Sequence, residues 1–268
     1  METPTFMGAH RIAPDTTSLS SWFPLPGLGI LPVNAFVINA AQPVLVDTGL
    51  SALREPFLKA VTDTIDPEAL RWIWLSHMDA DHLGNLEQVL ALAPNAKVVT
   101  NFLGMGKMML RHFDVSRVHL LEPGAVIDAG DRTLVPLQPA YYDAPETVGF
   151  FDSKSRVLFS ADAFGTLMQA PEREAAAIAP QALADGMIRW VAIDAPWLGL
   201  VDRSAFGRVL TSIERLDPAA IISGHLPVAR GITRALLGCL DRALAAGQIE
   251  GPDHAAVERL MAGNSAAA

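Results

Sequence analysis

The stretch from Ser76 to Asn85 constrains this chain more than any other feature. Four potential metal ligands fall within six residues: His77, Asp79, Asp81 and His82. The apolar residues 72–75 before them are typical of a short buried strand, and apolar residues at helical spacing follow over 83–92. The four side chains are therefore predicted to lie on a loop between a strand and a helix, where active-site residues are concentrated.

The spacing of these side chains suits two adjacent metal ions. Residues two apart in an extended segment point the same way, so His77, Asp79 and Asp81 are expected to converge. His82 is expected to begin the helix with its ring free to reach a second ion. The alternative interpretation is a solvated polar loop that contains these residues by chance.

A loop of this kind cannot complete the coordination of two ions, so further ligands must come from distant strands. Three later strand-like segments each end beside residues that can bind a metal: Tyr142, Asp143 and Glu146 after 133–137, Asp162 after 156–161, and His225 after 219–223. Each of these strands is expected to deliver one ligand to the site.

In this combination the chain resembles the metallo-β-lactamase superfamily, and most of all the oxygen-binding di-iron domain of flavodiiron proteins. The likeness runs from about Pro32 to Pro227 and rests on three further motifs: Val46-Asp47-Thr48-Gly49, Leu158-Phe159-Ser160-Ala161-Asp162-Ala163-Phe164-Gly165, and Ser223-Gly224-His225. Asp79 stands where hydrolytic members carry a second histidine and flavodiiron proteins carry a glutamate. The resemblance implies an α/β fold, an αββα sandwich with a dinuclear metal site at one edge.

The resemblance also implies a role for each candidate ligand: Asp162 bridges the ions, His77 and Asp79 bind the first, and Asp81, His82 and His225 bind the second. Asp81 and Asp162 are expected to act in catalysis. The chain lacks one family histidine. Alignment on Pro145 puts Asp143 in its place, with Tyr142 and Glu146 as alternatives. Asp47 is expected to orient a ligand histidine rather than bind metal itself.

The ligand set of three histidines and four aspartates favours hard, oxygen-preferring metals, so iron is expected, with manganese or zinc as alternatives. The first functional hypothesis is a non-haem di-iron oxidoreductase that binds or activates dioxygen or nitric oxide. The second is a dinuclear hydrolase that cleaves an ester, lactone, thioester or phosphoester through a bridging hydroxide. A third is an oxygen or redox sensor, or a degenerate site without metal.

The composition of the chain argues against some classes of binding partner. Lys and Arg number 20 against 29 Asp and Glu, a net charge of −9, which argues against nucleic-acid binding. Residues 1–14 lack the features of a secretory signal, and no apolar run approaches the ~18 residues needed to cross a bilayer, which predicts a cytoplasmic protein without membrane contact. Residues 1–268 are expected to form a single domain. The lone Cys239 is expected in the core.

Nothing after Pro227 is expected to hold FMN, because residues 228–263 are interpreted as mostly helix, without a strand followed by a phosphate-binding loop. Electrons would then come from a separate reductase or an oxidisable small-molecule substrate. The sequence leaves a homodimer open. Residues 167–183 are interpreted as a lid or channel wall. Met168, Trp190 and Trp197 would line the pocket or belong to the core.

Periodicity also predicts the remaining elements. Strands are expected at 35–38, 43–46 and 97–100, and helices at 53–64, 104–111, 204–216 and 228–246.

Overall fold

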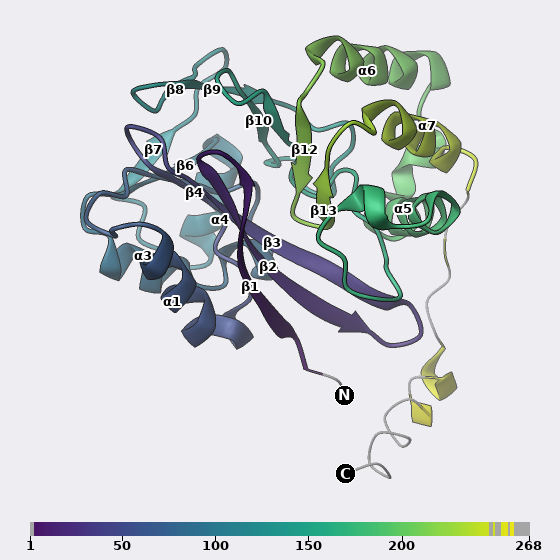
Figure 1. Ribbon diagram of the computed structural model, residues 1–268, viewed down its shortest axis with the longest axis horizontal. Coiled ribbons are helices and arrows are strands. Elements are labelled where there is room, and N and C mark those ends of the chain that lie inside the picture. The colour runs from purple at the N-terminus through teal and green to yellow at the C-terminus, as the bar shows by residue number, and fades with distance from the viewer. Residues whose placement is uncertain (1–2, 247–248, 250–252, 257, 260–268) are drawn as a thin grey trace.

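The computed structural model describes residues 3–246, 249, 253–256 and 258–259. Two β-sheets pack face to face, and helices cover the outer face of each (Figure 1). This arrangement is the αββα sandwich that the sequence predicts. Within the described residues, no helix combines the length and apolar character needed to cross a membrane.

The first sheet has seven strands in chain order: β1 (Thr5–Ala13), β2 (Thr16–Leu25), β3 (Gly29–Ile38), β4 (Val44–Val46), β5 (Trp72–Trp74), β6 (Lys97–Thr100) and β7 (Val118–Leu120). Strands β1 to β4 pair antiparallel, and β4 to β7 pair parallel. The carboxyl ends of the parallel strands meet at one edge, the usual position of ligand sites in open α/β sheets.

The second sheet has six strands in the order β13 (Leu226–Ala229), β12 (Ala220–Ser223), β11 (Val157–Phe159), β10 (Gly149–Asp152), β9 (Thr133–Leu137) and β8 (Ile127–Asp128). Only β11 and β12 pair parallel; the other neighbours are antiparallel. Because β11 and β12 run in the same direction, the loops that follow them leave the sheet side by side.

The helices fall into two sets. Those on the first sheet include α1 (Arg54–Thr64), α2 (Ala80–Leu83), α3 (Leu86–Leu92) and α4 (Phe102–Leu110). Those near the second sheet are α5 (Pro180–Asp194), α6 (Arg203–Leu216) and α7 (Thr233–Ala243). Short 3-10 turns cover Ser51–Leu53, Ala175–Ala177 and Pro196–Leu200.

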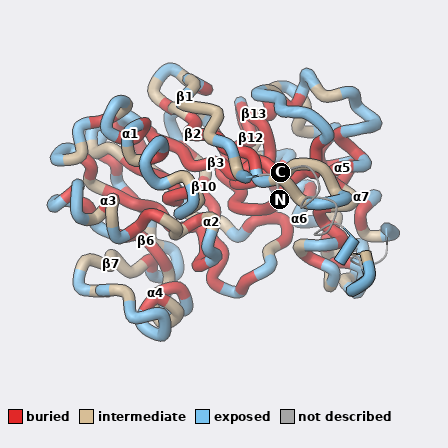
Figure 2. The backbone as a smooth tube through the Cα atoms, turned by 90° about the horizontal axis from the view of Figure 1, so that it is seen from below, coloured by how far each residue is buried: buried red, intermediate tan, exposed pale blue. Residues whose placement is uncertain are grey.

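Three apolar layers hold the sandwich together. Figure 2 shows which segments of the backbone are buried. The middle layer lies between the sheets and includes Trp74, Phe150 and Phe159. One outer layer packs Phe57 of α1 with strands of the first sheet, and the other packs Leu236 of α7 with the second sheet. Cys239 is buried in the layer under α7, as expected.

Polar contacts join the two sheets beside the ligand loops. The Asn34 side-chain amide of β3 donates to the carbonyls of Ser223 and Leu226 at 3.0 and 2.9 Å. The indole Nε1 of Trp74 donates to the Val148 carbonyl at 3.1 Å. These contacts fix the position of one sheet relative to the other where the ligand loops emerge.

Most predicted elements are present, and the exceptions have physical reasons. Val228 belongs to strand β13, so the predicted helix over 228–246 is wrong at its start and begins at Thr233. The rest of the helical prediction to 263 lies partly outside the described residues. Strands β1 and β2 were not predicted, because the buried Ser18 and Ser20 interrupt the apolar alternation of β2. Helix α5 begins inside the segment interpreted as a lid.

Candidate metal centre

The loop after β5 delivers the first set of candidate ligands. His77 is buried next to the strand end, Asp79 follows in extended backbone, and Asp81 and His82 lie on helix α2. The expectation that residues 77, 79 and 81 converge from an extended segment is therefore wrong for Asp81. Because the chain turns helical at Ala80, Asp81 points with His82 and His225 instead.

The loop after β11 delivers Asp162 in the centre of the site. Ala161 and Phe164 on either side of it have left-handed backbone, with φ of 49° and 70°. Such a conformation costs energy for residues other than glycine, and it persists where the surroundings impose it. Here the hydroxyls of Ser160 and Ser223 fix the turn by donating to the Ala163 and Ala161 carbonyls, each within 3.0 Å.

The turn between β12 and β13 delivers His225. Its Nδ1 lies 2.7 Å from the carbonyl oxygen of Pro32, so Nδ1 carries the proton and Nε2 faces the site. Gly224 allows this close approach. A β-carbon there would lie 2.8 Å from the His82 ring and 3.3 Å from Asp162 Oδ1.

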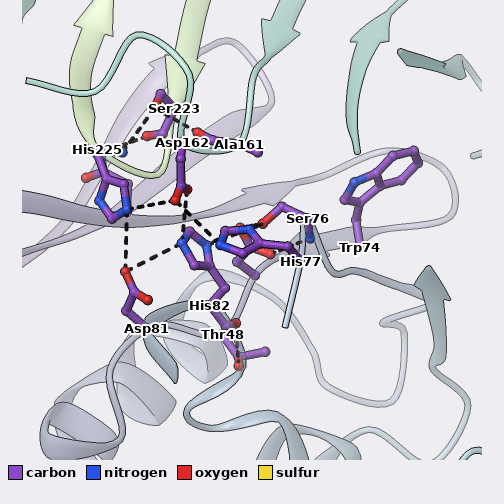
Figure 3. A network of polar contacts seen from close by, with 12 residues as sticks. Thr48, Trp74, Ser76, His77, Asp81, His82, Ala161, Asp162, Ser223 and His225 are labelled. Atoms are coloured by element: carbon purple, nitrogen blue, oxygen red, sulfur yellow. Dashed lines mark hydrogen bonds and ion pairs between the residues drawn. The ribbon is translucent and has the colours of Figure 1, made fainter. Parts of the chain in front are cut away.

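The two oxygens of Asp162 face three imidazoles (Figure 3). Oδ1 lies 3.1 Å from His82 Nε2. Oδ2 lies 3.5 Å from His77 Nε2 and 3.4 Å from His225 Nε2. A carboxylate placed this way offers one oxygen to each of two neighbouring cations.

A buried network holds the histidines of the first loop in place. Asp47 Oδ2 lies 2.9 Å from His82 Nδ1 and accepts from the Ser76 hydroxyl at 2.8 Å. That hydroxyl also lies 3.0 Å from His77 Nδ1. Asp47 has left-handed backbone, with φ of 57°, at the turn that the Asp-Thr-Gly motif marks. Its contact with His82 is the geometry that the orienting role expected from the sequence requires.

The potential ligands fall into two groups on either side of Asp162. The first group is His77, Asp79 and Asp143, and the second group is Asp81, His82 and His225; within each, ligand atoms lie within 4.8 Å of one another. His77, His82 and Asp162 form a third such cluster that joins the two. The structure thus brings together all seven residues that the sequence singles out.

Of the three alternatives for the missing histidine, Asp143 faces the site. Its Oδ2 lies 3.9 Å from His77 Nε2. The Tyr142 ring instead packs against Trp197, with ring centroids 5.5 Å apart. The Glu146 carboxylate is buried beside Lys107, with Oε1 and Nζ 2.6 Å apart.

The negative carboxylates and the imidazoles of the site shift one another's pKa values. Burial would raise the pKa of Asp162, but the three facing imidazoles lower it well below its ordinary value. Burial would lower the pKa of His225, yet the Asp162 charge raises it to about 9. Burial raises the pKa of Asp143, and the Asp162 charge adds to this against the pull of His77. A cation would replace these protons and relieve the repulsion between carboxylates.

Unpaired polar atoms support a metal site. Nε2 of His77, Nε2 of His82 and Oδ1 of Asp162 are buried, and none has a hydrogen-bond partner among the described residues. Leaving such atoms unpaired costs about 1–3 kcal/mol each. These are the atoms that face one another across the centre, so the residues present fit a dinuclear metal.

Two residues around the centre, Tyr141 and Asp194, had no role assigned from the sequence, whereas Trp190 was expected to line the pocket or belong to the core. Tyr141 is fully buried, and its hydroxyl lies 3.4 Å from the Asp162 carbonyl. Trp190 of α5 packs edge-on against His225, with centroids 4.8 Å apart. Asp194 ends the same helix. Its spacing of four from Trp190 is the one signal in the sequence that could have placed both on one helix face.

Met168 pairs with Ile30 and lines a surface pocket beside α5.

Comparison with known proteins agrees with this geometry. A family model described as ODP family beta lactamase matches residues 31–225. A putative diflavin flavoprotein from Nostoc sp. is 32% identical over 133 residues, which are 49% of this chain and 23% of that protein. The rubredoxin-oxygen oxidoreductase of Megalodesulfovibrio gigas is 26% identical over 142 residues, 52% of this chain and 35% of that protein.

Solved structures share the fold. Rubredoxin oxygen:oxidoreductase from Desulfovibrio gigas superposes with a TM-score of 0.75 at 20% identity, over 88% of this chain and 61% of that one. A fragment of a Nostoc sp. diflavin flavoprotein has a TM-score of 0.75 at 18% identity, over 91% of this chain and 98% of the fragment.

The sandwich and its ligand loops define a metallo-β-lactamase-type domain like the core of flavodiiron proteins. Within that class, the chain belongs to the ODP family of beta lactamases. The matched region corresponds to about a quarter to a third of the length of the two curated relatives described above.

Proposed function

We propose that this chain binds two iron ions and reduces dioxygen or nitric oxide with electrons from a separate donor. The first group, His77, Asp79 and Asp143, would hold one ion, and the second group the other, with Asp162 bridging. The observation that carries the proposal is the position of Asp162, whose two oxygens face three imidazoles inside a ring of carboxylates.

The balance of donors supports iron over zinc. Four of the seven ligand side chains are carboxylates, and anionic oxygens stabilise oxidised iron. The first group has only one imidazole, whereas zinc hydrolases of this fold depend more on histidine. Manganese shares the preference for oxygen ligands.

The residues of the chain keep the centre ready for metal. The Pro32 carbonyl and the Asp47 carboxylate hold the protons of His225 and His82 on Nδ1, so both Nε2 atoms face inward. The strained loop around Asp162 holds in place the carboxylate that would bridge the two ions. When bound, two iron ions supply electrons and binding positions for the small gas molecule.

The names of relatives support the redox reaction. They include a rubredoxin-oxygen oxidoreductase and an anaerobic nitric oxide reductase flavorubredoxin from Pectobacterium atrosepticum. We carry the reaction class from them to this chain as part of the proposal. A separate electron donor, no FMN of its own and a cytoplasmic location complete it, and the acidic net charge of −9 argues against nucleic acid as a partner.

The test loads the metal-free protein with Fe(II) without oxygen and then mixes it with dioxygen or nitric oxide. We expect near-ultraviolet absorption of carboxylate-bridged ferric ions after dioxygen, and continued gas consumption only with an added reductant or oxidisable substrate. The Asp162→Asn variant is the inactive control.

The competing outcomes are distinct. Zinc-dependent cleavage of an activated ester, lactone or phosphodiester, with no oxygen reactivity in the iron form, would identify the hydrolase instead. Stoichiometric oxidation by dioxygen without turnover, whatever reductant is supplied, would favour a sensor.

A further inference from the structure

The inner end of helix α5 places two unpaired polar atoms behind the metal centre. Nε1 of Trp190 is a hydrogen-bond donor, and Oδ2 of Asp194 is an acceptor when ionised. Both atoms are buried without a hydrogen-bond partner among the described residues. The two residues are four apart, so they lie on the same face of the helix, one turn from each other.

This helix face is directed at the loop that carries Asp162. The Trp190 ring packs against His225, and a β-carbon on Gly165 would lie 2.3 Å from Nε1, so Gly165 makes room for the indole. Tyr141 lies at the same loop. Burial raises the pKa of its phenol, and the next largest contribution comes from the negative charge of Asp194. The charge of the Asp194 carboxyl therefore acts on that hydroxyl.

Asp194 is an unusual residue for its position. It is the last residue of α5, where the helix dipole disfavours a negative charge. The residue is partly exposed while its Oδ2 is fully buried, so it extends from the surface to the interior. No ion pair stabilises it within the described part of the chain.

We propose that Asp194 is the proton donor of the metal centre, passing protons from solvent through water held by Trp190 Nε1 and the Tyr141 hydroxyl. The proposal rests on the reduction proposed above, because that chemistry consumes protons. Four protons and four electrons convert dioxygen to two waters, and two of each convert two nitric oxide molecules to nitrous oxide and water. The electrons come from the external donor, and Asp194 is reprotonated from solvent.

The charges around Asp194 suit a donor. Burial raises its pKa to about 8, helped by the charges of Asp162 and Asp143 and opposed by those of His225 and His82. The charge of Asp194 in turn raises the pKa of the buried Tyr141 phenol, after the larger effect of burial. The metal-free protein therefore keeps a proton on Asp194 at neutral pH. Cations in the centre would favour the ionised form and so make the proton easier to release. A donor is most effective when its pKa lies near the working pH.

The first experiment needs no activity. Infrared difference spectra of the metal-free protein, recorded about two pH units on either side of 8, should show the carbonyl band of a protonated carboxyl that shifts in D2O. The band should be missing in Asp194→Asn and present in Asp185→Asn, an exposed aspartate on the same helix. If the wild type and Asp194→Asn give the same spectra, Asp194 does not hold the proton and the proposal is wrong.

The second experiment uses the iron-loaded protein with excess reductant. Asp194→Asn should keep its iron content but consume dioxygen on the order of 100-fold more slowly, with a larger solvent isotope effect. Asp194→Glu should recover part of the rate, and Asp185→Asn should match wild type. An unchanged rate and isotope effect in Asp194→Asn would overturn the relay. A wild type that consumes neither gas rejects the proposed reduction and the relay with it, whereas the infrared band separately decides whether Asp194 carries an exchangeable proton.

Discussion

The first and second ligand groups flank the same carboxylate, but their side chains are supported to different degrees. In the second group, His82 and His225 are buried, and each Nδ1 is held by a buried acceptor, Asp47 or the Pro32 carbonyl. In the first group only His77 is buried, while Asp79 and Asp143 lie at the exposed rim. We infer that the second group is preorganised for its ion and the first is adjustable.

This difference suits the two groups to different roles in a dinuclear centre: tight binding of one ion and adjustment to an arriving substrate or ion. Preorganised ligands bind tightly because little ordering remains to be done on binding. Exposed carboxylates can change position as a substrate or ion arrives. The second group is therefore expected to bind its ion first during metal titration. The first group is expected to control how easily a substrate or ion reaches the centre.

Removing the shared carboxylate should have the largest effect. Asp162→Asn withdraws the charge that faces both groups, so we expect loss of both ions and not of one. Metal analysis after gel filtration in equimolar iron gives the stoichiometry, with Asp63→Asn on α1 as an exposed control. One ion retained with normal affinity would mean that the second group is complete without Asp162.

Removing a rim ligand should affect one ion only. In Asp143→Ala the metal content should fall towards one ion per chain, because the first group would keep only His77 and Asp79. Glu146→Gln in the same loop is the matched control, since its carboxylate faces Lys107 instead. If Asp143→Ala still binds two ions tightly and Glu146→Gln loses one, then Glu146 and not Asp143 is the ligand of the first group.

The sequence predicted which candidate ligands come together better than it predicted what surrounds them. His77, Asp162 and His225 each follow a short apolar strand, and strand ends at one edge of a sandwich must converge, so local patterns were sufficient. Asp143 could be placed by Pro145, but no local pattern shows that Tyr142 packs against Trp197, a contact between distant segments. The spacing of four could place Asp194 on the same helix face as Trp190, but its burial depends on how α5 packs and has no local signal in the sequence.

A change in the support of the second group should have a smaller effect than loss of a ligand. Asp47→Asn keeps the shape of the side chain but removes its negative charge beside His82. We expect roughly 10- to 100-fold weaker binding of one ion, the range typical for partners of metal-binding histidines. Competition with a chelator measures each affinity. Equal weakening of both ions would show that the two groups are not independently supported.

The smallest expected effect is on the stability of the metal-free protein. The pKa of His225 is raised from 6.5 to about 9 in the folded state, so its contribution to stability is fully present below about 6.5 and is lost as the pH rises through 9. His82 shifts in the same direction. The melting temperature should fall by a few degrees over this range. In His225→Gln the melting temperature should depend less steeply on pH. If the dependence is unchanged in this variant, groups other than His225 cause it.

The hydrogen bonds from Asn34 to the Ser223 and Leu226 carbonyls join residues 189 and 192 positions apart. During synthesis, the first-loop histidines leave the ribosome long before Ser223, Gly224 and His225 exist. A partly made chain can therefore offer an ion only a few carboxylates and imidazoles on an open sheet. In the proposed dinuclear centre, tight loading would have to wait until both sheets have closed on each other. Metal content would then report whether a given molecule has been made and folded through residue 225.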